Sequence, residues 1–318
     1  MVNNGKKRRW IFLLPVLVAI IAVIVSSGRQ NGTRRSQEEN GSLKVFVSIL
    51  PQKYFVEKIG GKLVKVGVLV GPGQNHDSYE PLPKQMAALA EADLFFRIGV
   101  PFEAVLIDRI QELNPSLKVV DTREGITLRP IEGAHRHGAA EEGSDTAVPE
   151  PVDRDEVKDP HIWLDPLLVK IQAETICRAL ITLDPDHQAF YEENLRRFQA
   201  ELDGLDRELA EVFRAAKVDK IMVYHPAWGY LTDRYGLEQI PIEVEGKEPG
   251  PQQLAQVIER AKREGIRVVF VQSQFDTRAA ESVARAVNAQ VVTLDPLAED
   301  YLTNLRQMAE ALARGLSQ

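Results

Sequence analysis

Cysteine is almost absent from this chain of 318 residues, because Cys177 is the only one. A single thiol cannot form an internal disulfide, and it cannot supply the several thiolates of a structural zinc site. Any metal site in this protein must therefore be built from histidine and carboxylate side chains. Histidine is also scarce, with six in the chain, so each one at a special position carries weight.

Basic side chains are in the minority, with 39 Lys and Arg against 46 Asp and Glu and a formal net charge of −7. Residues 1–28 hold four positive charges and no acid, so the remainder of the chain carries −11. An acidic body disfavours binding to nucleic acid and raises the local concentration of cations. We therefore expect no nucleic-acid partner. A hydrophobic content of 44% and a charged content of 27% are typical of a globular protein.

The N-terminus has the pattern of an export signal. Lys6 to Arg9 form a positive cluster, an apolar run follows from Trp10 to Val25, and the small residues Ser26-Ser27-Gly28 come next. The run is slightly shorter than the roughly 17–25 residues of a membrane span. Residues 1–28 are therefore predicted to be either a cleaved signal or a retained membrane anchor, and residues 29–42 a polar tether. Either way we expect an exported protein, in the periplasm or on the outer face of the cytoplasmic membrane.

From Leu43 onward, short apolar runs alternate with helical patterns, which favours mostly parallel sheets flanked by helices. The predicted strands are Leu43–Ile49, Val64–Val70, Asp93–Ile98, Leu117–Asp121, Lys220–Tyr224, Leu237–Glu243, Arg267–Val271 and Gln290–Leu294. The helical patterns include Pro83–Ala92, Phe102–Leu113, Pro251–Glu264, Thr277–Asn288 and Ala298–Gly315. The fold class is thus α/β, with two Rossmann-like lobes of about four strands each.

A long helical pattern separates the two groups of strands. Asp184 is placed as its N-cap and Pro185 at its first position, and apolar residues recur at three- and four-residue steps. At 1.5 Å per residue this helix would be roughly 50 Å long, which is more than one lobe needs. Residues 185–217 are therefore expected to link an N-terminal lobe at 43–184 to a C-terminal lobe at 218–318.

Residues 130–160 break the β/α alternation. The stretch is acidic, has little apolar content and contains His135 and His137. This composition predicts a mobile loop within the N-terminal lobe. The two histidines could gather metal loosely or could simply be solvated.

Three histidines and one carboxylate stand where ligands gather in α/β proteins. His225 and Asp295 directly follow predicted strands, and His76 lies six residues past another. Ligands of open α/β sheets bind beyond the carboxyl ends of the strands. His161 lies in the loop that leads into a helix near Pro166. Because imidazole and carboxylate suit divalent transition metals, we expect His76, His161, His225 and Asp295 to form a metal site.

Each of these residues also has a plain structural interpretation. His76 could be a surface residue, His161 a helix cap, His225 a hydrogen-bonded core histidine and Asp295 a helix N-cap. His187, near a helix start, is interpreted as structural.

Several motifs in order along the chain carry a family resemblance. They are Ser48-Ile49-Leu50-Pro51-Gln52-Lys53-Tyr54, Gly73 to Pro83, Gly99-Val100-Pro101-Phe102-Glu103, Asp159 to Pro166, Tyr224-His225-Pro226-Ala227-Trp228-Gly229-Tyr230, Ile242 to Pro249 and Val269-Phe270-Val271-Gln272. From about Lys44 to its end, the chain resembles the zinc/manganese-type (cluster A-I) periplasmic solute-binding proteins of bacterial metal ABC transporters, in their zinc-binding branch.

The resemblance implies that His76, His161, His225 and Asp295 coordinate one Zn²⁺ between two lobes. It also implies a receptor, not an enzyme, that hands its ion to an ABC transporter permease in the membrane, and we expect a monomer. Mn²⁺ is less favoured, because manganese-type relatives tend to carry Glu where His225 stands. One departure concerns the first ligand, because the family pattern His-x-Tyr-Glu-Pro has an extra residue here, in His76-Asp77-Ser78-Tyr79-Glu80-Pro81. Asp77 could therefore contribute in place of His76.

Three other functions stay open at this point. The first is a manganese or iron receptor of the same transporter class. The second is a zinc-dependent hydrolase, which would keep one coordination position open for water. The third is a surface adhesion protein, since receptors tethered outside a membrane can acquire partners.

Overall fold

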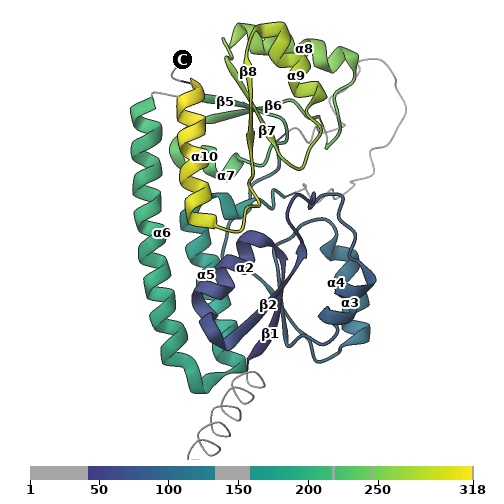
Figure 1. Ribbon diagram of the computed structural model, residues 1–318, viewed down its shortest axis with the longest axis vertical. Helices are drawn as coiled ribbons and strands as arrows, with labels where there is room; N and C mark the ends of the chain where they lie inside the picture. Colours follow the sequence, from purple (N-terminus) through teal and green to yellow (C-terminus); the bar gives the residue numbers. More distant parts are fainter. Residues whose placement is uncertain (1–41, 133–157, 217–218, 245, 317–318) are drawn as a thin grey trace, which may run out of the picture. The chain divides into compact units, whose positions relative to one another are not determined.

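The computed structural model describes residues 42–132, 158–216, 219–244 and 246–316 (Figure 1). The chain divides into two compact units, Met1–Leu43 and Lys44–Gln318, and nearly all described residues belong to the second. Among the described residues, no helix is both long and apolar enough to cross a membrane. The predicted signal or anchor at 1–28 and most of the tether lie outside the described residues.

The first lobe is built on a four-stranded sheet in the order β2-β1-β3-β4. The pairings of β1 with β3 and of β3 with β4 are parallel. Val45, Val47 and Ile49 alternate along β1 and are fully buried, as a central strand requires. Its strands are β1 (Leu43–Ile49), β2 (Val64–Val70), β3 (Leu94–Arg97) and β4 (Lys118–Asp121), and its helices are α2 (Leu50–Gly60), α3 (Pro83–Leu89) and α4 (Glu103–Leu113).

The second lobe repeats this plan with a sheet in the order β6-β5-β7-β8, whose neighbouring strands pair in parallel. Val268–Gln272 is buried along its whole length, and the core beside it contains Met222, Ile240 and Val283. Its strands are β5 (Lys220–Val223), β6 (Glu238–Pro241), β7 (Val268–Gln272) and β8 (Gln290–Leu294), and its helices are α7 (Gly229–Tyr235), α8 (Pro251–Arg263) and α9 (Arg278–Val287).

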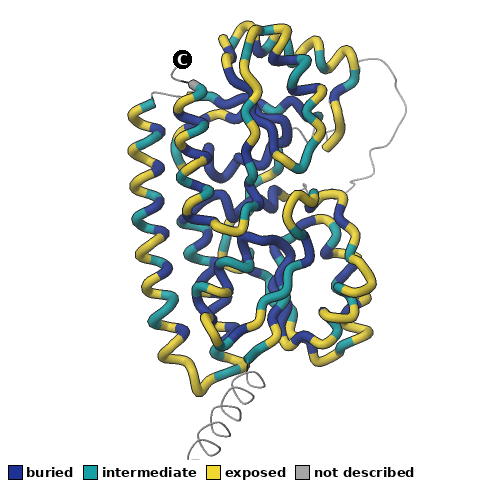
Figure 2. The backbone as a smooth tube through the Cα atoms, in the orientation of Figure 1, coloured by how far each residue is buried: buried dark blue, intermediate teal, exposed yellow. Residues whose placement is uncertain are grey.

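Helix α6 (Gln188–Ala216) extends alongside both sheets, with α5 (Pro166–Leu183) beside the first lobe and α10 (Tyr301–Leu316) beside the second (Figure 1). Helix α6 packs against α2 and α5 of the first lobe and against α10, which follows the last strand of the second (Figure 1). One stripe of α6 is buried and the opposite side is exposed (Figure 2). The buried stripe consists of Tyr191, Phe198, Leu202, Leu205, Leu209 and Phe213.

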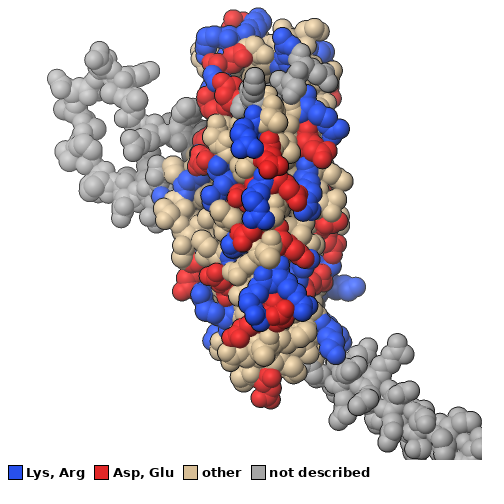
Figure 3. Space-filling model, turned by 90° about the vertical axis from the view of Figure 1, so that its left-hand side faces the viewer, with Lys and Arg blue, Asp and Glu red and all other residues tan. Residues whose placement is uncertain are grey.

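Ion pairs also tie α6 to its neighbours. Arg306 of α10 pairs with Glu208 at 2.5 Å, Lys58 of α2 with Glu201 at 2.6 Å, and Lys170 of α5 with Asp203 at 2.6 Å. Figure 3 shows the resulting mixture of acidic and basic side chains on this face of the molecule. Each such exposed pair is worth at most about 1 kcal/mol, so the apolar stripe remains the main attachment.

The predicted fold class is confirmed, and β1, β2 and β8 have the predicted bounds. The linking helix begins later than predicted, because Pro185–His187 forms a short 3-10 turn and α6 starts at Gln188. Asp184 makes no capping bond to the backbone; its carboxylate instead contacts Nδ1 of His187 at 2.8 Å and accepts from the Tyr191 hydroxyl at 2.7 Å. The predicted lobe boundaries stay predictions.

Cys177 lies within α5 and is 2% exposed. Burial raises the pKa of its thiol to about 11.

Candidate metal centre

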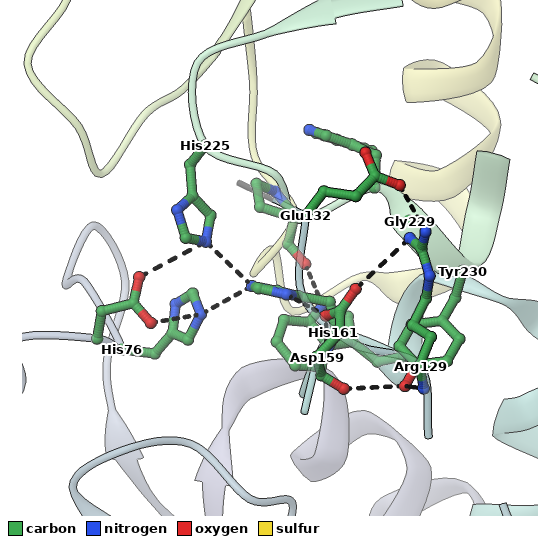
Figure 4. Close-up of polar contacts among 12 residues, drawn as sticks. His76, Arg129, Glu132, Asp159, His161, His225, Gly229 and Tyr230 are labelled. Carbon is green, nitrogen blue, oxygen red and sulfur yellow. Dashed lines mark hydrogen bonds and ion pairs between the residues drawn. The ribbon is translucent and has the colours of Figure 1, made fainter. Parts of the chain in front are cut away.

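Three imidazole rings meet between the two sheets (Figure 4). Nε2 of His161 lies 3.1 Å from Nε2 of His76 and 3.3 Å from Nε2 of His225. Two nitrogens bound to the same tetrahedral zinc ion, each about 2.0–2.1 Å from it, are about 3.3 Å apart. Among the described residues, these three histidines form the group whose ligand atoms lie within 4.8 Å of one another. Their spacing therefore suits a metal ion at their centre.

Each histidine reaches this point from a different part of the chain. His76 lies in the loop after β2, His161 precedes the 3-10 turn Ile162–Leu164, and His225 lies two residues past the end of β5. The side chain of Gln272 fixes the backbone of His225, with its amide donating to the carbonyl of His225 at 2.8 Å. The backbone N–H of His225 donates back to Oε1 of Gln272 at 3.3 Å. The end of β7 thus positions the ligand that follows β5.

Two of the three rings are held from behind by carboxylates. Nδ1 of His161 lies 2.7 Å from Oδ1 of Asp159, and Nδ1 of His225 lies 2.5 Å from Oε2 of Glu243. When Nδ1 donates to a carboxylate, Nε2 is left to face a metal ion, which is how metal-binding histidines are usually oriented. His76 differs, because its buried Nδ1 has no hydrogen-bond partner among the described residues. His76 is therefore the least constrained of the three ligands.

The site is shielded from solvent. His76 is 2% exposed, His161 0% and His225 4%. The ring of His225 stacks on Phe275 with centroids 4.8 Å apart, and the ring of Trp163 lies 5.0 Å from that of His161. A buried and partly aromatic surrounding excludes competing water and strengthens electrostatic interactions at the centre.

This surrounding changes the pKa values of the groups. Burial lowers the pKa of His76 to about 3. Burial also acts to lower the pKa of His225, but the hydrogen bond to Glu243 and the charge of Asp77 outweigh it, so the pKa of His225 is raised. For Asp77 burial acts upward, and the nearby imidazoles, His76 first, outweigh it and lower the pKa. Asp77 is thus held as a carboxylate beside the three rings.

The carboxylate of Asp77 lies close to the Nε2 atoms of His76 and His225, the nitrogens that would face a metal ion. Its Oδ1 is 3.5 Å from Nε2 of His76 and its Oδ2 is 3.6 Å from Nε2 of His225. Its backbone N–H donates to the side chain of Asn75 at 2.8 Å, which turns the loop so that His76 and Asp77 both face inward. The extra residue in the first motif is therefore accommodated by a turn that presents both side chains.

Asp295 lies outside the group of three histidines. Its Oδ1 accepts from Nε2 of Gln274 at 2.6 Å and from the backbone N–H of Leu297 at 3.0 Å. The address after β8 is as expected, but the carboxylate is engaged in the loop that precedes α10. The structure therefore brings together His76, His161 and His225 and does not bring Asp295 with them.

The plain structural interpretations can be compared with these positions. The N-cap of α5 is Asp165, whose side chain accepts from Leu167 at 2.8 Å, so His161 does not cap that helix. His187 contacts Asp184 near the start of α6. His135 and His137 lie outside the described residues.

Asp159 and Glu243 were not singled out as functional residues by the sequence patterns. Asp159 is two positions before His161, and this spacing lets a single Oδ1 accept from the backbone N–H of His161 at 3.0 Å as well as from its ring. That local signal was available in the sequence. Glu243 follows a different strand from His225, so only the pairing of β5 with β6 brings the two together.

Fold and site together define a two-lobed α/β protein with a buried metal-binding centre between its lobes. The family model described as "Zinc-uptake complex component A periplasmic" matches residues 45–315. The chain belongs to this family.

Three similar proteins illustrate its range. The crystal structure of a zinc-bound ZnuA deletion mutant has a TM-score of 0.77 and 42% identity, and the match covers 87% of this chain and 99% of that one. The manganese ABC transporter substrate-binding lipoprotein PsaA of Streptococcus anginosus is 27% identical, over 96% of this chain and 98% of that one. The laminin-binding protein Lmb of Streptococcus agalactiae, described as an adhesin with metal-transporting activity, has a TM-score of 0.73 and 27% identity, over 86% of this chain and 100% of that one.

Proposed function

We propose that this protein is an exported receptor that binds one zinc ion and delivers it to an ABC-type importer permease. The observation that carries the proposal is the convergence of three buried Nε2 atoms, two of them on rings that a carboxylate orients. Membership of the zinc-uptake family supports the transport role. On this proposal the site binds zinc as the transported ion, and its burial favours tight binding rather than catalysis.

His76, His161 and His225 are proposed as three of the ligands. Metal analysis of protein purified without added metal, together with a competition titration against a chelating dye, tests the site. We expect one zinc per chain. A stoichiometry near zero, or binding that survives replacement of all three histidines by alanine, would overturn the assignment.

The fourth ligand is proposed to be Asp77 in place of Asp295. Both oxygens of Asp77 already lie within 3.6 Å of a ring nitrogen, whereas Asp295 would have to give up its bonds to Gln274 and Leu297. The matched variants Asp77→Asn and Asp295→Asn separate the two, with Co²⁺ as a spectroscopic substitute for zinc. We expect the visible bands of bound Co²⁺ to change with the first substitution. A change with the second substitution alone would make Asp295 the ligand.

Zinc is favoured over manganese by the donor set. Three imidazoles with one carboxylate suit zinc, whereas manganese prefers oxygen-rich coordination. Because manganese-binding lipoproteins occur among the relatives, a manganese receptor is the competing function. Since most sites of this kind bind zinc more tightly than manganese, the comparison has to be made between variants, as described below.

The protein is proposed not to be an enzyme. A catalytic zinc needs a free position and room for a substrate, and the three histidines here are at most 4% exposed. A turnover assay of the zinc-loaded protein with ester and peptide substrates tests this; activity that disappears in the His161→Ala variant would support the hydrolase instead. We further propose a location outside the cytoplasmic membrane. We also propose a monomeric state, which sedimentation of the zinc-loaded protein measures directly.

A further inference from the structure

One arginine lies directly behind the metal centre and faces three carboxylates from three segments of the chain (Figure 4). The guanidinium of Arg129 is 2.5 Å from Glu132, 3.2 Å from Asp233 of α7 and 3.8 Å from Asp159. Arg129 belongs to the segment that follows β4, so its pair with Asp233 crosses from the first lobe to the second. Its side chain is 18% exposed, and of the three pairs only the one with Asp159, which is 0% exposed, is shielded from solvent, since Glu132 and Asp233 are 34% and 62% exposed.

The two oxygens of Asp159 have separate tasks. Oδ1 accepts from the backbone N–H of His161 at 3.0 Å and contacts the ring Nδ1 at 2.7 Å. Oδ2 has no hydrogen-bond partner among the described residues, and its ion pair with Nη1 of Arg129 is the contact that faces it. Asp159 is 0% exposed, and a buried carboxylate is costly without a compensating cation. Arg129 thus supplies a charge that the orienting partner of His161 requires.

Tyr230 of α7 joins the backbones of Arg129 and Asp159 through its hydroxyl. Its hydroxyl accepts from the backbone N–H of Arg129 at 3.1 Å and donates to the backbone carbonyl of Asp159 at 2.9 Å. The backbone N–H of Asp159 donates to the carbonyl of Arg129 at 2.9 Å. The two chain segments that meet here, at Arg129 and at Asp159, are therefore fixed to each other and to the second lobe.

Gly229 provides the space that the arginine occupies. A Cβ atom at this position would lie 1.3 Å from Nη1 of Arg129 and 2.9 Å from Oδ2 of Asp159. Gly229 is not among the glycines with positive φ, so its backbone conformation does not demand glycine. The requirement for glycine here is steric, because any side chain would fill the space that the guanidinium of Arg129 occupies.

We propose that Arg129 is a positioning residue of the metal centre, seated against Gly229, which holds Asp159 and through it the ring of His161. This deepens the proposed zinc site and rests on it. The chain of contacts runs from α7 through the guanidinium to Oδ2, and from Oδ1 to Nδ1 of His161. Loss of the guanidinium frees Asp159 to turn, and His161 then presents its Nε2 less precisely to the metal ion.

The test is a set of variants of the full chain measured with zinc and with Co²⁺. Arg129→Met removes the charge, and Gly229→Ala displaces the guanidinium without removing it. The matched control is Arg123→Met. Arg123 resembles Arg129 in exposure, at 22%, and in being ion-paired, to Asp121 at 2.6 Å. The readouts are zinc affinity by competition, the visible spectrum of bound Co²⁺, and the melting temperature of the metal-free protein.

We expect Arg129→Met and Gly229→Ala each to weaken zinc binding by roughly 10–100-fold, the usual effect of losing an outer partner of a ligand. Both should shift the Co²⁺ bands, which a loss of stability alone would not do. The double variant should bind about as well as Arg129→Met. The collision of the added Cβ with the guanidinium is then gone, and its remaining close contact, 2.9 Å to Oδ2, is with an Asp159 side chain that the loss of Arg129 has already freed to turn; such non-additivity marks a shared contact. Arg123→Met should leave affinity and spectrum unchanged.

Two results would overturn the proposal: an Arg129→Met protein that matches Arg123→Met in affinity and spectrum, or additive effects in the double variant. Failure of the zinc site itself looks different. If the unaltered protein binds no zinc, or if His161→Ala binds as tightly as the unaltered protein, the proposed function fails together with the role of Arg129. If His161→Ala loses binding and Arg129→Met does not, the role of Arg129 fails alone.

Discussion

At the scale of single residues, the site could be predicted in part. His76, His161 and His225 were recognised because strand ends and prolines gave them distinct positions in the sequence, and the fold brings their Nε2 atoms together. Asp295 has the same kind of position and stays a predicted ligand. Its carboxylate accepts from the amide of Gln274, and no pattern in the sequence signals that bond. The close packing of Arg129 against Gly229 could not be predicted for a similar reason, because the two residues meet only through the packing of α7.

Replacing His161 or His225 by alanine should weaken zinc binding more than the roughly 10–100-fold that loss of an outer partner costs. Each variant removes one metal bond, while folding depends on two separate apolar cores. His187→Ala is the control, since that ring is about half exposed and pairs with Asp184. Competition titrations and circular dichroism of the three variants give the answer. Unchanged affinity in both ligand variants would remove these residues from the site.

His225→Glu should narrow the gap between zinc and manganese affinity. The substitution exchanges an imidazole for a carboxylate, which moves the donor set toward the oxygen ligands that manganese prefers. It also removes an imidazole that suits zinc and the ring nitrogen that contacts Glu243, which should lower the affinity for zinc. The control is His187→Glu, which makes the same exchange at a half-exposed ring outside the group of three histidines. If His225→Glu keeps the original preference ratio, His225 does not select the metal.

At the scale of elements, the sequence predicts most of the architecture. Apolar runs of strand length and their turn residues located the strands that the structure describes. The signal is clearest for β7, because a parallel strand buried on both faces is continuously apolar. Ends of helices were less predictable. Asp184-Pro185 has the pattern of a helix start, but Asp184 is engaged by His187 and Tyr191, so the first turn tightens and α6 begins at Gln188. Local competition of this kind depends on side chains that meet only in the folded chain.

Gly204→Ala should stabilise the protein. Gly204 lies inside α6, and an added Cβ would meet nothing within 4 Å. Alanine in a helix interior is favoured over glycine by roughly 0.5–1 kcal/mol. Gly236→Ala is the matched control, since its Cβ is equally unobstructed but its φ of +70° strains any side chain. Urea unfolding should therefore give opposite signs for the two variants. A loss of stability in Gly204→Ala would contradict the argument.

At the scale of the whole molecule, helix α6, which extends alongside both sheets, limits how far the lobes can move. Helix α6 is continuous over Gln188–Ala216 and attaches to α2 and α5 on one side of the site and to α10 on the other. Hinge closure in other two-lobed binding proteins relies on a few loop residues that absorb large changes in φ and ψ. A packed helix has no such residues, so the lobes are expected to tilt slightly rather than to close widely.

Small-angle scattering of the metal-free and zinc-loaded protein should therefore give nearly the same radius of gyration. The comparison variant is Glu208→Pro, in which α6 is broken. Proline in a helix interior costs about 3 kcal/mol or more. That variant should show a larger difference between the two states. A large fall in radius on loading the unaltered protein would mean that α6 does not restrain the lobes.

The lone cysteine has a practical consequence for such measurements. Cys177 is 2% exposed, and burial raises the pKa of its thiol to about 11, so very little reactive thiolate is present at neutral pH. A cysteine introduced on the surface of either lobe will thus outcompete it for a maleimide dye. One new thiol per lobe makes the chain ready for distance measurements by fluorescence, with the native residue left in place and α5 undisturbed.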